Sequence, residues 1–248
     1  MDTNFLVVVP FHNAGPFLPD CAASLISQTH TSWRAVFADD ASTDGGLGRV
    51  PSDPRFTMVR SERRQTALEN IHNTIVAADP DPEDVICLVD GDDFLTRADA
   101  LALVSALYGR PGTMLTYGQY VWPNGMPGHC RAYTRDTFAS LRAGGYWASH
   151  LRTFKYGLYK EMMRQDPELS CYRDGTGEFY RTCYDVAMMT PLMEIAGFEG
   201  VAFNPHPLYY YRQHPANDHV VDRGAQKRAE VEIFAKRPFA CLVGRGKK

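Results

Sequence analysis

The sequence contains no apolar run that approaches the roughly 18 residues needed by a membrane-spanning helix. Its first residues lack the basic segment ahead of an apolar stretch that marks a secretory signal peptide. The formal net charge of −3 gives no excess of positive charge, which general nucleic-acid binding requires. We therefore expect a soluble, cytoplasmic protein that does not bind nucleic acid.

The six cysteines form no C-x-x-C pair and show no zinc-finger spacing. Cys87 lies inside an apolar run, where a buried thiol is expected, so a reducing compartment is favoured. A chain of 248 residues with 44% hydrophobic residues is long enough to bury a substantial core. Length and composition predict one large α/β domain, alone or with a small appendage.

Several nucleotide-binding and hydrolase motifs are also missing. The sequence has no G-x-x-x-x-G-K-[ST] loop, and "GGLG" at residues 45–48 does not complete G-x-G-x-x-G. It has neither a G-x-S-x-G elbow nor an H-E-x-x-H pair. What remains is a site that holds phosphates through a cation bound by carboxylates.

Strand and helix patterns alternate in the first 110 residues. Apolar runs at 5–9, 35–38 and 85–89 predict strands buried on both faces. Apolar spacings of three to four predict helices after residue 16, around 68–75 and after Thr96, which with Asp99 resembles a capping box. This alternation indicates βαβ units, whose ligands bind beyond the carboxyl ends of the strands.

Two acidic clusters fall at such strand ends: Asp39-Asp40, and Asp90, Asp92 and Asp93 around Gly91. Taken alone, "DGDD" is more often a solvated turn. Three crowded carboxylates repel one another, however, and a divalent cation relieves that repulsion. The spacing does not fit an EF-hand.

At this point the sequence resembles a known family. "VVVPFHNAGPFLPDCAASLISQTHTSWRAVFADDASTDGG", followed after about fifty residues by "VICLVDGDDFL", is similar to the opening of a family 2 glycosyltransferase. The resemblance covers roughly 4–219. It implies an α/β fold: a single GT-A (Rossmann-like) domain over 1–219 with a mostly parallel central sheet flanked by helices. Residues 1–110 would form the nucleotide-sugar-binding half, 111–219 the acceptor and catalytic half, and 220–248 a basic C-terminal tail or helix.

The resemblance also implies a nucleotide pocket. In it, Asp39 hydrogen-bonds the base, Asp40 braces the loop, and Asp90 approaches the ribose or a metal-bound water. Arg63 and Arg64 fall where polar contacts to the nucleotide occur, although surface charge at a helix start explains them equally well. The nucleotide-binding residues implied are Pro10, His12, Asn13, Asp39, Arg63, Arg64 and Asp90.

A metal site is implied beside this pocket. Asp92, with Asp90, would hold a divalent cation on the diphosphate, Mn²⁺ being favoured and Mg²⁺ the alternative, while Asp93 holds the loop. In related sequences a histidine after the "YYYR" segment reaches the metal or diphosphate. Here His214 is placed slightly ahead of His219, although a lone histidine is more often not a ligand.

The catalytic base implied by the resemblance is Asp185, in the first turn of a helix that ends near Gly197. Tyr184 occupies the preceding position, where the family usually has glutamate, so Glu178 and Asp174 remain reserve candidates. An acid in a first turn also simply complements the helix dipole. His150 and Arg152 could meet the donor sugar or acceptor, or equally serve packing. Trp122 could stack on a sugar ring, although core packing is the commoner outcome, and Arg212 could neutralise charge on the departing nucleoside diphosphate.

Together these features predict a metal-dependent, inverting glycosyltransferase that moves a sugar from a nucleotide-sugar donor, with UDP favoured, to a hydroxyl of a glycan, protein or lipid-linked acceptor. The alternatives are a non-catalytic nucleotide-sugar-binding module and a metal-dependent hydrolase. The basic stretch 222–248 could contact an anionic membrane, but a solvated helix with a frayed end is the commoner outcome.

Overall fold

The computed structural model describes residues 3–143, 145–214 and 222–242. These residues form one eight-stranded sheet in the order β3-β2-β1-β4-β7-β6-β8-β5. The strands are β1 (Phe5–Phe11), β2 (Trp33–Asp39), β3 (Phe56–Arg60), β4 (Val85–Leu88), β5 (Phe94–Leu95), β6 (Leu115–Val121), β7 (Arg152–Lys155) and β8 (Val201–Tyr210). The α-helices are α1 (Leu18–Ile26), α2 (Ala67–Ala78), α3 (Ala100–Tyr108), α4 (Arg135–Ala139), α5 (Tyr156–Gln165), α6 (Tyr184–Gly200) and α8 (Arg223–Ala235), with short 3₁₀ turns η1 (Gly46–Arg49) and η2 (Ser170–Tyr172).

The sheet is mostly parallel, as expected. Strands β1 to β4 run in one direction, β6 and β8 are parallel to each other, and β7 and β5 run antiparallel to their neighbours. The register pairs Phe11 with Asp39 and Val8 with Leu88. Because β1, β2 and β4 are parallel, the loops that follow them meet at one edge of the sheet.

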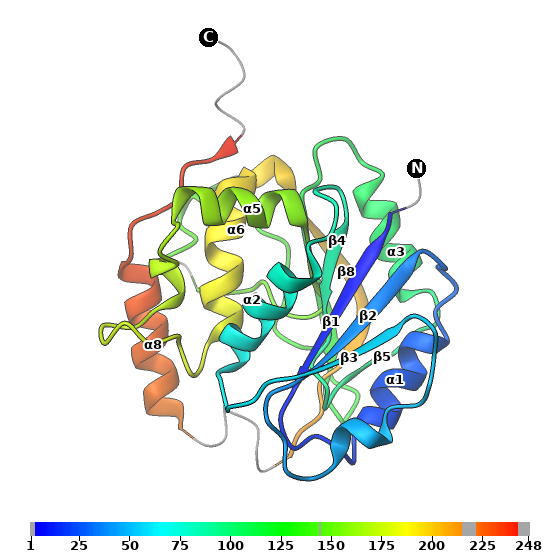
Figure 1. Cartoon of the computed structure of the whole chain (residues 1–248). Helices are drawn as coiled ribbons and strands as arrows, with labels where there is room; N and C mark the ends of the chain where they lie inside the picture. Colours follow the sequence, from blue (N-terminus) through cyan, green and yellow to red (C-terminus); the bar gives the residue numbers. More distant parts are fainter. Residues whose placement is uncertain (1–2, 144, 215–221, 243–248) are drawn as a thin grey trace.

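Helices cover both faces of the sheet. Alternate side chains of β1 point to opposite faces: Leu6 and Val8 pack in the core under α2, α5 and α6, whereas Val7 and Val9 pack against α1 and α3. Figure 1 shows this division, with α2, α5, α6 and α8 on one side of the strands and α1 and α3 on the other. The apolar runs of the sequence are therefore continuous because both faces of these strands are buried.

The start of α3 differs from the expectation. The prediction of a capping box at Thr96 and Asp99 is wrong. Asp99 is the N-cap of α3, and its side chain makes no capping hydrogen bond. Thr96 instead continues the pairing of β5 with β8, donating its N–H to Leu208 O (3.0 Å) and its hydroxyl to Pro207 O (2.6 Å). Sheet pairing has displaced the local capping pattern.

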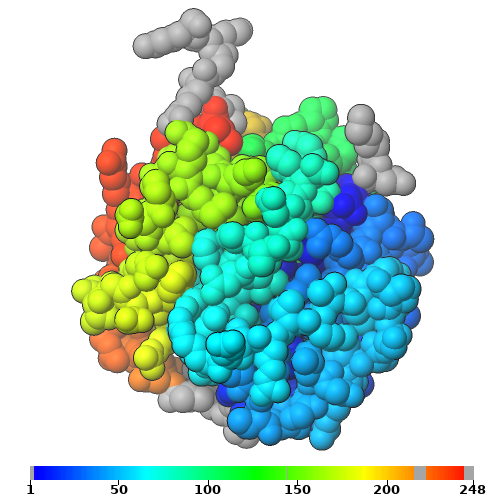
Figure 2. All heavy atoms as spheres, viewed as in Figure 1, coloured from blue at the N-terminus to red at the C-terminus, as the bar shows by residue number. Residues whose placement is uncertain are grey.

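Helix α6 lies at the centre of the second half of the chain. Its helical dihedral angles are interrupted at Gly197 (φ 68°), as the expected helix end indicated. Helix α8 packs onto α6 through Ala229 and Ile233, which belong to the same core cluster as β1 and α2. In the space-filling view, the cyan of α2 lies between the blue N-terminal segments and the green and yellow of α5 and α6 (Figure 2).

Among the described residues, no helix has both the length and the apolar character needed to cross a bilayer.

Candidate active site

The loops after β1 and β2 are joined by hydrogen bonds. Asn13 donates its N–H to Ser42 Oγ (2.9 Å), and its side-chain oxygen accepts the N–H of Thr43 (2.8 Å). Gly15 N–H binds Asp44 Oδ2 (2.8 Å). Asn13 has φ 51°, a left-handed conformation that asparagine tolerates better than most residues. Asn13 therefore holds together the two loops that border the predicted nucleotide pocket.

One carboxylate oxygen of Asp39 accepts a hydrogen bond and the other does not. Oδ1 accepts the N–H of Ser42 (2.8 Å), whereas Oδ2 has no hydrogen-bond partner among the described residues, with Arg60 Nε at 3.7 Å. The residue is only 1% exposed. Buried polar atoms are normally paired, so a carboxylate oxygen without a hydrogen-bond partner at the end of β2 could accept an N–H of a ligand.

Asp40 braces the loop, as the resemblance implied. Its Oδ1 accepts the N–H of Gln65 (2.6 Å), its Oδ2 is paired with Arg64, and its carbonyl is 2.7 Å from His12 Nδ1. Arg63 is exposed and pairs with Glu69 in the first turn of α2 (2.6 Å). Both arginines thus contact carboxylates of the protein itself.

The D-x-D turn, which is Asp90-Gly91-Asp92 after β4, packs against β1. Gly91 donates its N–H to Pro10 O (3.0 Å), and a Cβ at Gly91 would lie 2.6 Å from the Cβ of Phe11. Only glycine fits this approach. The N–H of Asp90 binds the hydroxyl of Tyr209 (3.0 Å), which fixes the turn to β8 as well.

The side chain of Asp90 enters a polar cluster. It accepts hydrogen bonds from Arg152 Nη2 (3.2 Å) and from the hydroxyl of Tyr184 (2.5 Å). Burial raises the pKa of the Asp90 carboxyl, Arg152 opposes this shift, and Asp92 adds to it. Arg152 is only 1% exposed although it carries a full charge. Such a buried cation requires carboxylates close by.

His150 lies in the wall of this cluster. Its ring stacks on Tyr209 (centroids 4.2 Å apart), and its Nδ1 lies 3.1 Å from Arg152 Nη2 and 4.0 Å from Asp90 Oδ2. Burial, reinforced by the charge of Arg152, lowers the pKa of His150 well below its ordinary value. The imidazole is therefore neutral near pH 7.

Asp92 and His214 meet on the more open side of the turn. Their Oδ2 and Nε2 atoms are 2.8 Å apart, with the side chains 24% and 20% exposed. Arg212 donates its Nε–H to Asp92 O (2.8 Å) and its backbone N–H to Asp93 Oδ1 (2.7 Å). Asp93 is buried, which with the charges of Asp92 and Asp90 raises its pKa well above the usual range. Asp93 thus holds the loop.

Two donor sets could bind a divalent cation. One is Asp92 with His214, a carboxylate and an imidazole already in contact. The other, Asp90, Asp93 and His150, offers ligand atoms within 4.8 Å of one another but is engaged in internal contacts. Oxygen and imidazole donors suit Mn²⁺. His219, the second predicted histidine, lies outside the described residues.

Asp185 lies in the first turn of α6, as predicted, and its side chain is 26% exposed. Its Oδ2 is 4.0 Å from Arg152 Nη1, and its carbonyl accepts the hydroxyl of Tyr146 (3.2 Å). Of the reserve candidates, Asp174 closes a surface turn by binding the N–H and hydroxyl of Thr176, and Glu178 is exposed. Of these three acids, Asp185 is the one that lies beside Arg152, which also binds Asp90.

Trp122 begins the turn after β6. Its backbone N–H binds Met126 O (2.9 Å), and its ring packs edge-on against Tyr120 and Tyr211. Tyr120 in turn packs edge-on against His150. Trp122 is therefore joined to the site through aromatic contacts.

Three tyrosines contribute to the site: Tyr146, for which the sequence left open sugar stacking or core packing, and Tyr184 and Tyr209, for which it predicted no binding role. Their hydroxyls contact Asp185, Asp90 and the D-x-D backbone, respectively. The available signal was position, since two of them adjoin predicted site residues in "CYD" and "YYYR". Tyrosine is so common in cores that this signal is weak.

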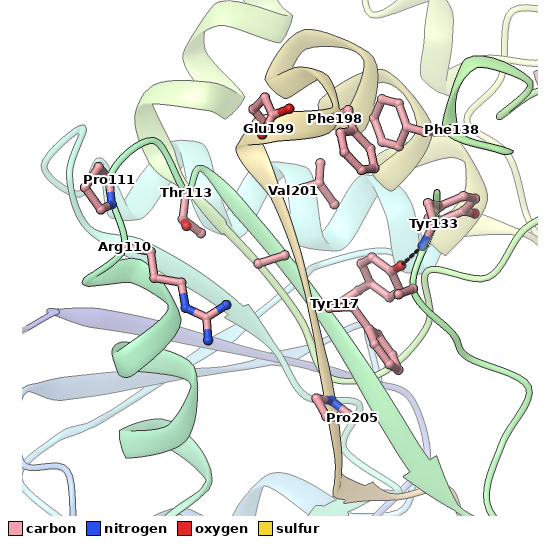
Figure 3. Close-up of a pocket in the computed structure, with 13 residues that line it drawn as sticks. Arg110, Pro111, Thr113, Tyr117, Tyr133, Phe138, Phe198, Glu199, Val201 and Pro205 are labelled. Carbon is pink, nitrogen blue, oxygen red and sulfur yellow. Dashed lines mark hydrogen bonds between the residues drawn. The ribbon is translucent and has the colours of Figure 1, made fainter. Parts of the chain in front are cut away.

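A separate pocket of about 490 Å³ lies at the starts of β6 and β8, the opposite edge of the sheet from the carboxyl end of β4. Figure 3 shows its aromatic walls, including Tyr117, Phe138 and Phe198, and its charged rim at Arg110 and Glu199. The lining includes none of the predicted site residues described above.

Solved structures with a similar fold include proteins of S. aureus and Pyrobaculum calidifontis. TarS of S. aureus in complex with UDP has a TM-score of 0.61 at 16% identity, covering 86% of this chain and 61% of that one. Its complex with UDP-GlcNAc has a TM-score of 0.63 at 14% identity, covering 89% and 61%. The mannosyltransferase PcManGT of Pyrobaculum calidifontis, in complex with GDP-Man and Mn²⁺, has a TM-score of 0.61 at 18% identity, covering 95% and 64%. The GT-A fold is thereby confirmed, and the chain spans less than two thirds of each of these neighbours.

Sequence comparison identifies the family. The uncharacterized protein y4gI of Sinorhizobium fredii is 28% identical over 165 residues, which is 63% of this chain and 18% of that protein. The profile described as Glycosyl transferase family 2 matches residues 6–182. The chain belongs to glycosyl transferase family 2.

Proposed function

We propose that this protein transfers a sugar from a nucleotide-sugar donor, with UDP as the favoured nucleotide, to a hydroxyl of an acceptor with inversion at the anomeric carbon. The observation that carries the proposal is the convergence of three acidic groups at one edge of the sheet. Asp39 pairs in register with the end of β1, to which the Asp90–Asp92 turn is also bonded. Arg152 connects that turn to Asp185.

The donor would lie across the ends of β1, β2 and β4. Asp39 Oδ2 offers an acceptor for a base N–H, and the Asp90–Asp92 turn faces the sugar and diphosphate. The solved neighbours support this class of donor, because they are complexes with UDP, UDP-GlcNAc and GDP-Man. The acceptor we propose is a glycan, protein or lipid-linked hydroxyl.

A divalent cation, Mn²⁺ by preference, fits the donor set of Asp92 and His214. Both side chains reach the open side of the turn, and a carboxylate with an imidazole is a suitable pair of ligands. When bound, the cation would neutralise charge that develops on the nucleoside diphosphate. The complex of the mannosyltransferase neighbour with Mn²⁺ supports this assignment.

Three side chains would take part in the inverting displacement: Asp185, Arg152 and Arg212. Asp185 would accept the proton of the acceptor hydroxyl as its oxygen attacks the anomeric carbon and the bond to the diphosphate breaks. Arg152 lies between Asp185 and Asp90, so one guanidinium faces both the acceptor and donor sides. Arg212, held at the turn by Asp92 O and Asp20, would place a second positive charge near the leaving group.

The test is a panel of UDP- and GDP-sugars with and without Mn²⁺, measured by thermal shift and donor hydrolysis. We expect stabilisation by one donor that requires the metal and is lost in Asp92→Asn. Asp99→Asn, which removes a carboxylate from an exposed ion pair with Arg97, is the matched control and should behave as the wild type. No response to any nucleotide would overturn the proposal. Hydrolysis that is unaffected by acceptors would favour the hydrolase alternative instead.

A further inference from the structure

We infer that Tyr184 is a positioning residue for the transfer: its hydroxyl fixes Arg152 between the donor-side carboxylate of Asp90 and the carboxylate of Asp185. The inference rests on the proposed function. It assigns a role to a side chain that does not reach the substrate itself, and the role can be separated from general stability by measurement.

The hydroxyl of Tyr184 makes two hydrogen bonds at once. It donates to Asp90 Oδ1 (2.5 Å) and accepts from Arg152 Nη2 (2.6 Å). A phenol has one proton to donate and lone pairs to accept, so both bonds are satisfied together. Phenylalanine at this position would fill the same space and provide neither.

Arg152 is the group that these bonds orient. Its Nη2 also reaches Asp90 Oδ2 (3.2 Å), and its Nη1 lies 4.0 Å from Asp185 Oδ2. The guanidinium thus links the turn after β4 to the first turn of α6, two elements far apart in sequence. Its Nε has no hydrogen-bond partner among the described residues, so the orientation depends on contacts at the Nη atoms.

An uncharged side chain at position 184 is important because several charged groups lie close together around it. Asp90 and Asp185 already face one guanidinium, and a further carboxylate at position 184 would add repulsion in a buried setting. A tyrosine hydroxyl is uncharged at neutral pH, so it can donate one hydrogen bond and accept another. Tyr184 can therefore hold both partners without adding a charge.

Loss of the Tyr184 hydroxyl should alter the contacts of both Asp90 and Arg152. Asp90 would keep Arg152 but lose its second donor, which loosens the carboxylate on the donor side. Arg152 would lose the shortest of three contacts at its Nη2 and keep those with Asp90 and His150, so its position relative to Asp185 should change. A purely structural tyrosine would instead change the amount of folded protein and leave the donor KM unaltered.

The experiment compares Tyr184→Phe with Tyr172→Phe, a fully buried tyrosine of η2 that belongs to the core beside α6 and not to the acidic cluster. Wild type is first tested for metal-dependent nucleotide-sugar binding by calorimetry, because absence of binding there would refute the proposed function rather than this inference. With binding established, we expect Tyr184→Phe to raise the donor KM about tenfold and to lower kcat, as loss of a hydrogen bond to a charged group predicts. Tyr172→Phe should leave the donor KM unchanged.

A double-mutant cycle tests the link to Arg152. Because the hydroxyl acts through the guanidinium, Tyr184→Phe should have much less effect in an Arg152→Lys background than in wild type. If Tyr184→Phe does not fold, 3-fluorotyrosine at position 184 changes the strength of both hydrogen bonds while keeping the ring and the hydroxyl, and the donor KM should again change. A folded Tyr184→Phe or fluorotyrosine protein with wild-type donor KM and kcat, or strict additivity in the cycle, would overturn the inference.

Discussion

Asp92 and His214 are 122 positions apart in the chain, yet Asp92 Oδ2 and His214 Nε2 lie 2.8 Å from each other. The contact ties the D-x-D turn after β4 to the segment after β8. Arg212 strengthens it by donating to Asp92 O and to Asp93. The pair of candidate metal ligands therefore exists only once the second half of the sheet has formed.

The metal assignment is tested by His214→Gln, which removes the imidazole and keeps a polar side chain. We expect the apparent affinity for Mn²⁺ in the presence of the nucleotide to fall about 10- to 100-fold. Loss of a group that supports a metal site typically has an effect of this size. The measurement is a Mn²⁺ titration followed by thermal unfolding in the presence of UDP. His206→Gln, at an exposed position of β8, is the control. Equal metal affinity in both variants would place the cation on the Asp90, Asp93 and His150 set.

Local sequence patterns predicted much of the fold correctly. The apolar runs at 5–9, 35–38 and 85–89 match β1, β2 and β4, because strands buried on both faces must be apolar throughout. The position of Asp185 in the first turn of α6 and the break at Gly197 also follow from local spacing. These features depend on neighbours within a few residues, which a sequence displays directly.

The contacts that organise the site could not be predicted in this way. Tyr184 meets Asp90 across 94 positions, and Arg152 meets it across 62. The Arg152 contact arises because β7 inserts between β4 and β6, an order that the alternating pattern of the first half does not imply, whereas Tyr184 comes from the start of α6. Another non-local pairing, that of β5 with β8, displaced the expected cap at Thr96. Their place in the folded structure, rather than their residue type, brings these side chains together.

The role of Asp185 is tested by Asp185→Asn, which keeps the size of the side chain and removes its ability to accept a proton. We expect donor binding to remain while kcat for transfer falls about 10²- to 10⁴-fold, the usual contribution of general base catalysis. Binding is measured by calorimetry and transfer by product formation. Glu178→Gln, on the exposed surface turn, should keep wild-type turnover. Normal turnover by the Asp185 variant would refute its role as base.

The nucleotide pocket is tested by Asp39→Asn. The change replaces a carboxylate whose Oδ2 has no hydrogen-bond partner among the described residues, so a base N–H would lose a charged acceptor. We expect about tenfold weaker binding of UDP, as hydrogen bonds to charged groups typically contribute. Asp53→Asn, at a surface ion pair with Arg55, controls for loss of a carboxylate elsewhere. If both variants bind UDP as the wild type does, the base lies away from Asp39.

Acid sensitivity should depend in part on His72, which packs beside Tyr159 with its Nδ1 2.8 Å from the hydroxyl. Burial, followed by the charge of Arg173, lowers the pKa of His72 in the folded protein below its ordinary value of 6.5. The unfolded chain then binds a proton more readily than the folded one as the pH falls below that value. The stability contribution is complete above the unfolded pKa and decreases as the solution becomes more acidic, by at most about 1.4 kcal/mol per pH unit for one proton.

His72→Gln should therefore reduce the loss of unfolding free energy between pH 7 and pH 5 relative to wild type. Urea denaturation at each pH measures it, with His206→Gln as the control for removing a histidine from an exposed position. An equally steep or steeper loss in His72→Gln would mean that the ring accepts its proton in the folded state as easily as in the unfolded chain. The decrease must appear as a change in denaturation midpoint at constant m-value, because a changed m-value would indicate altered exposure on unfolding instead of proton linkage.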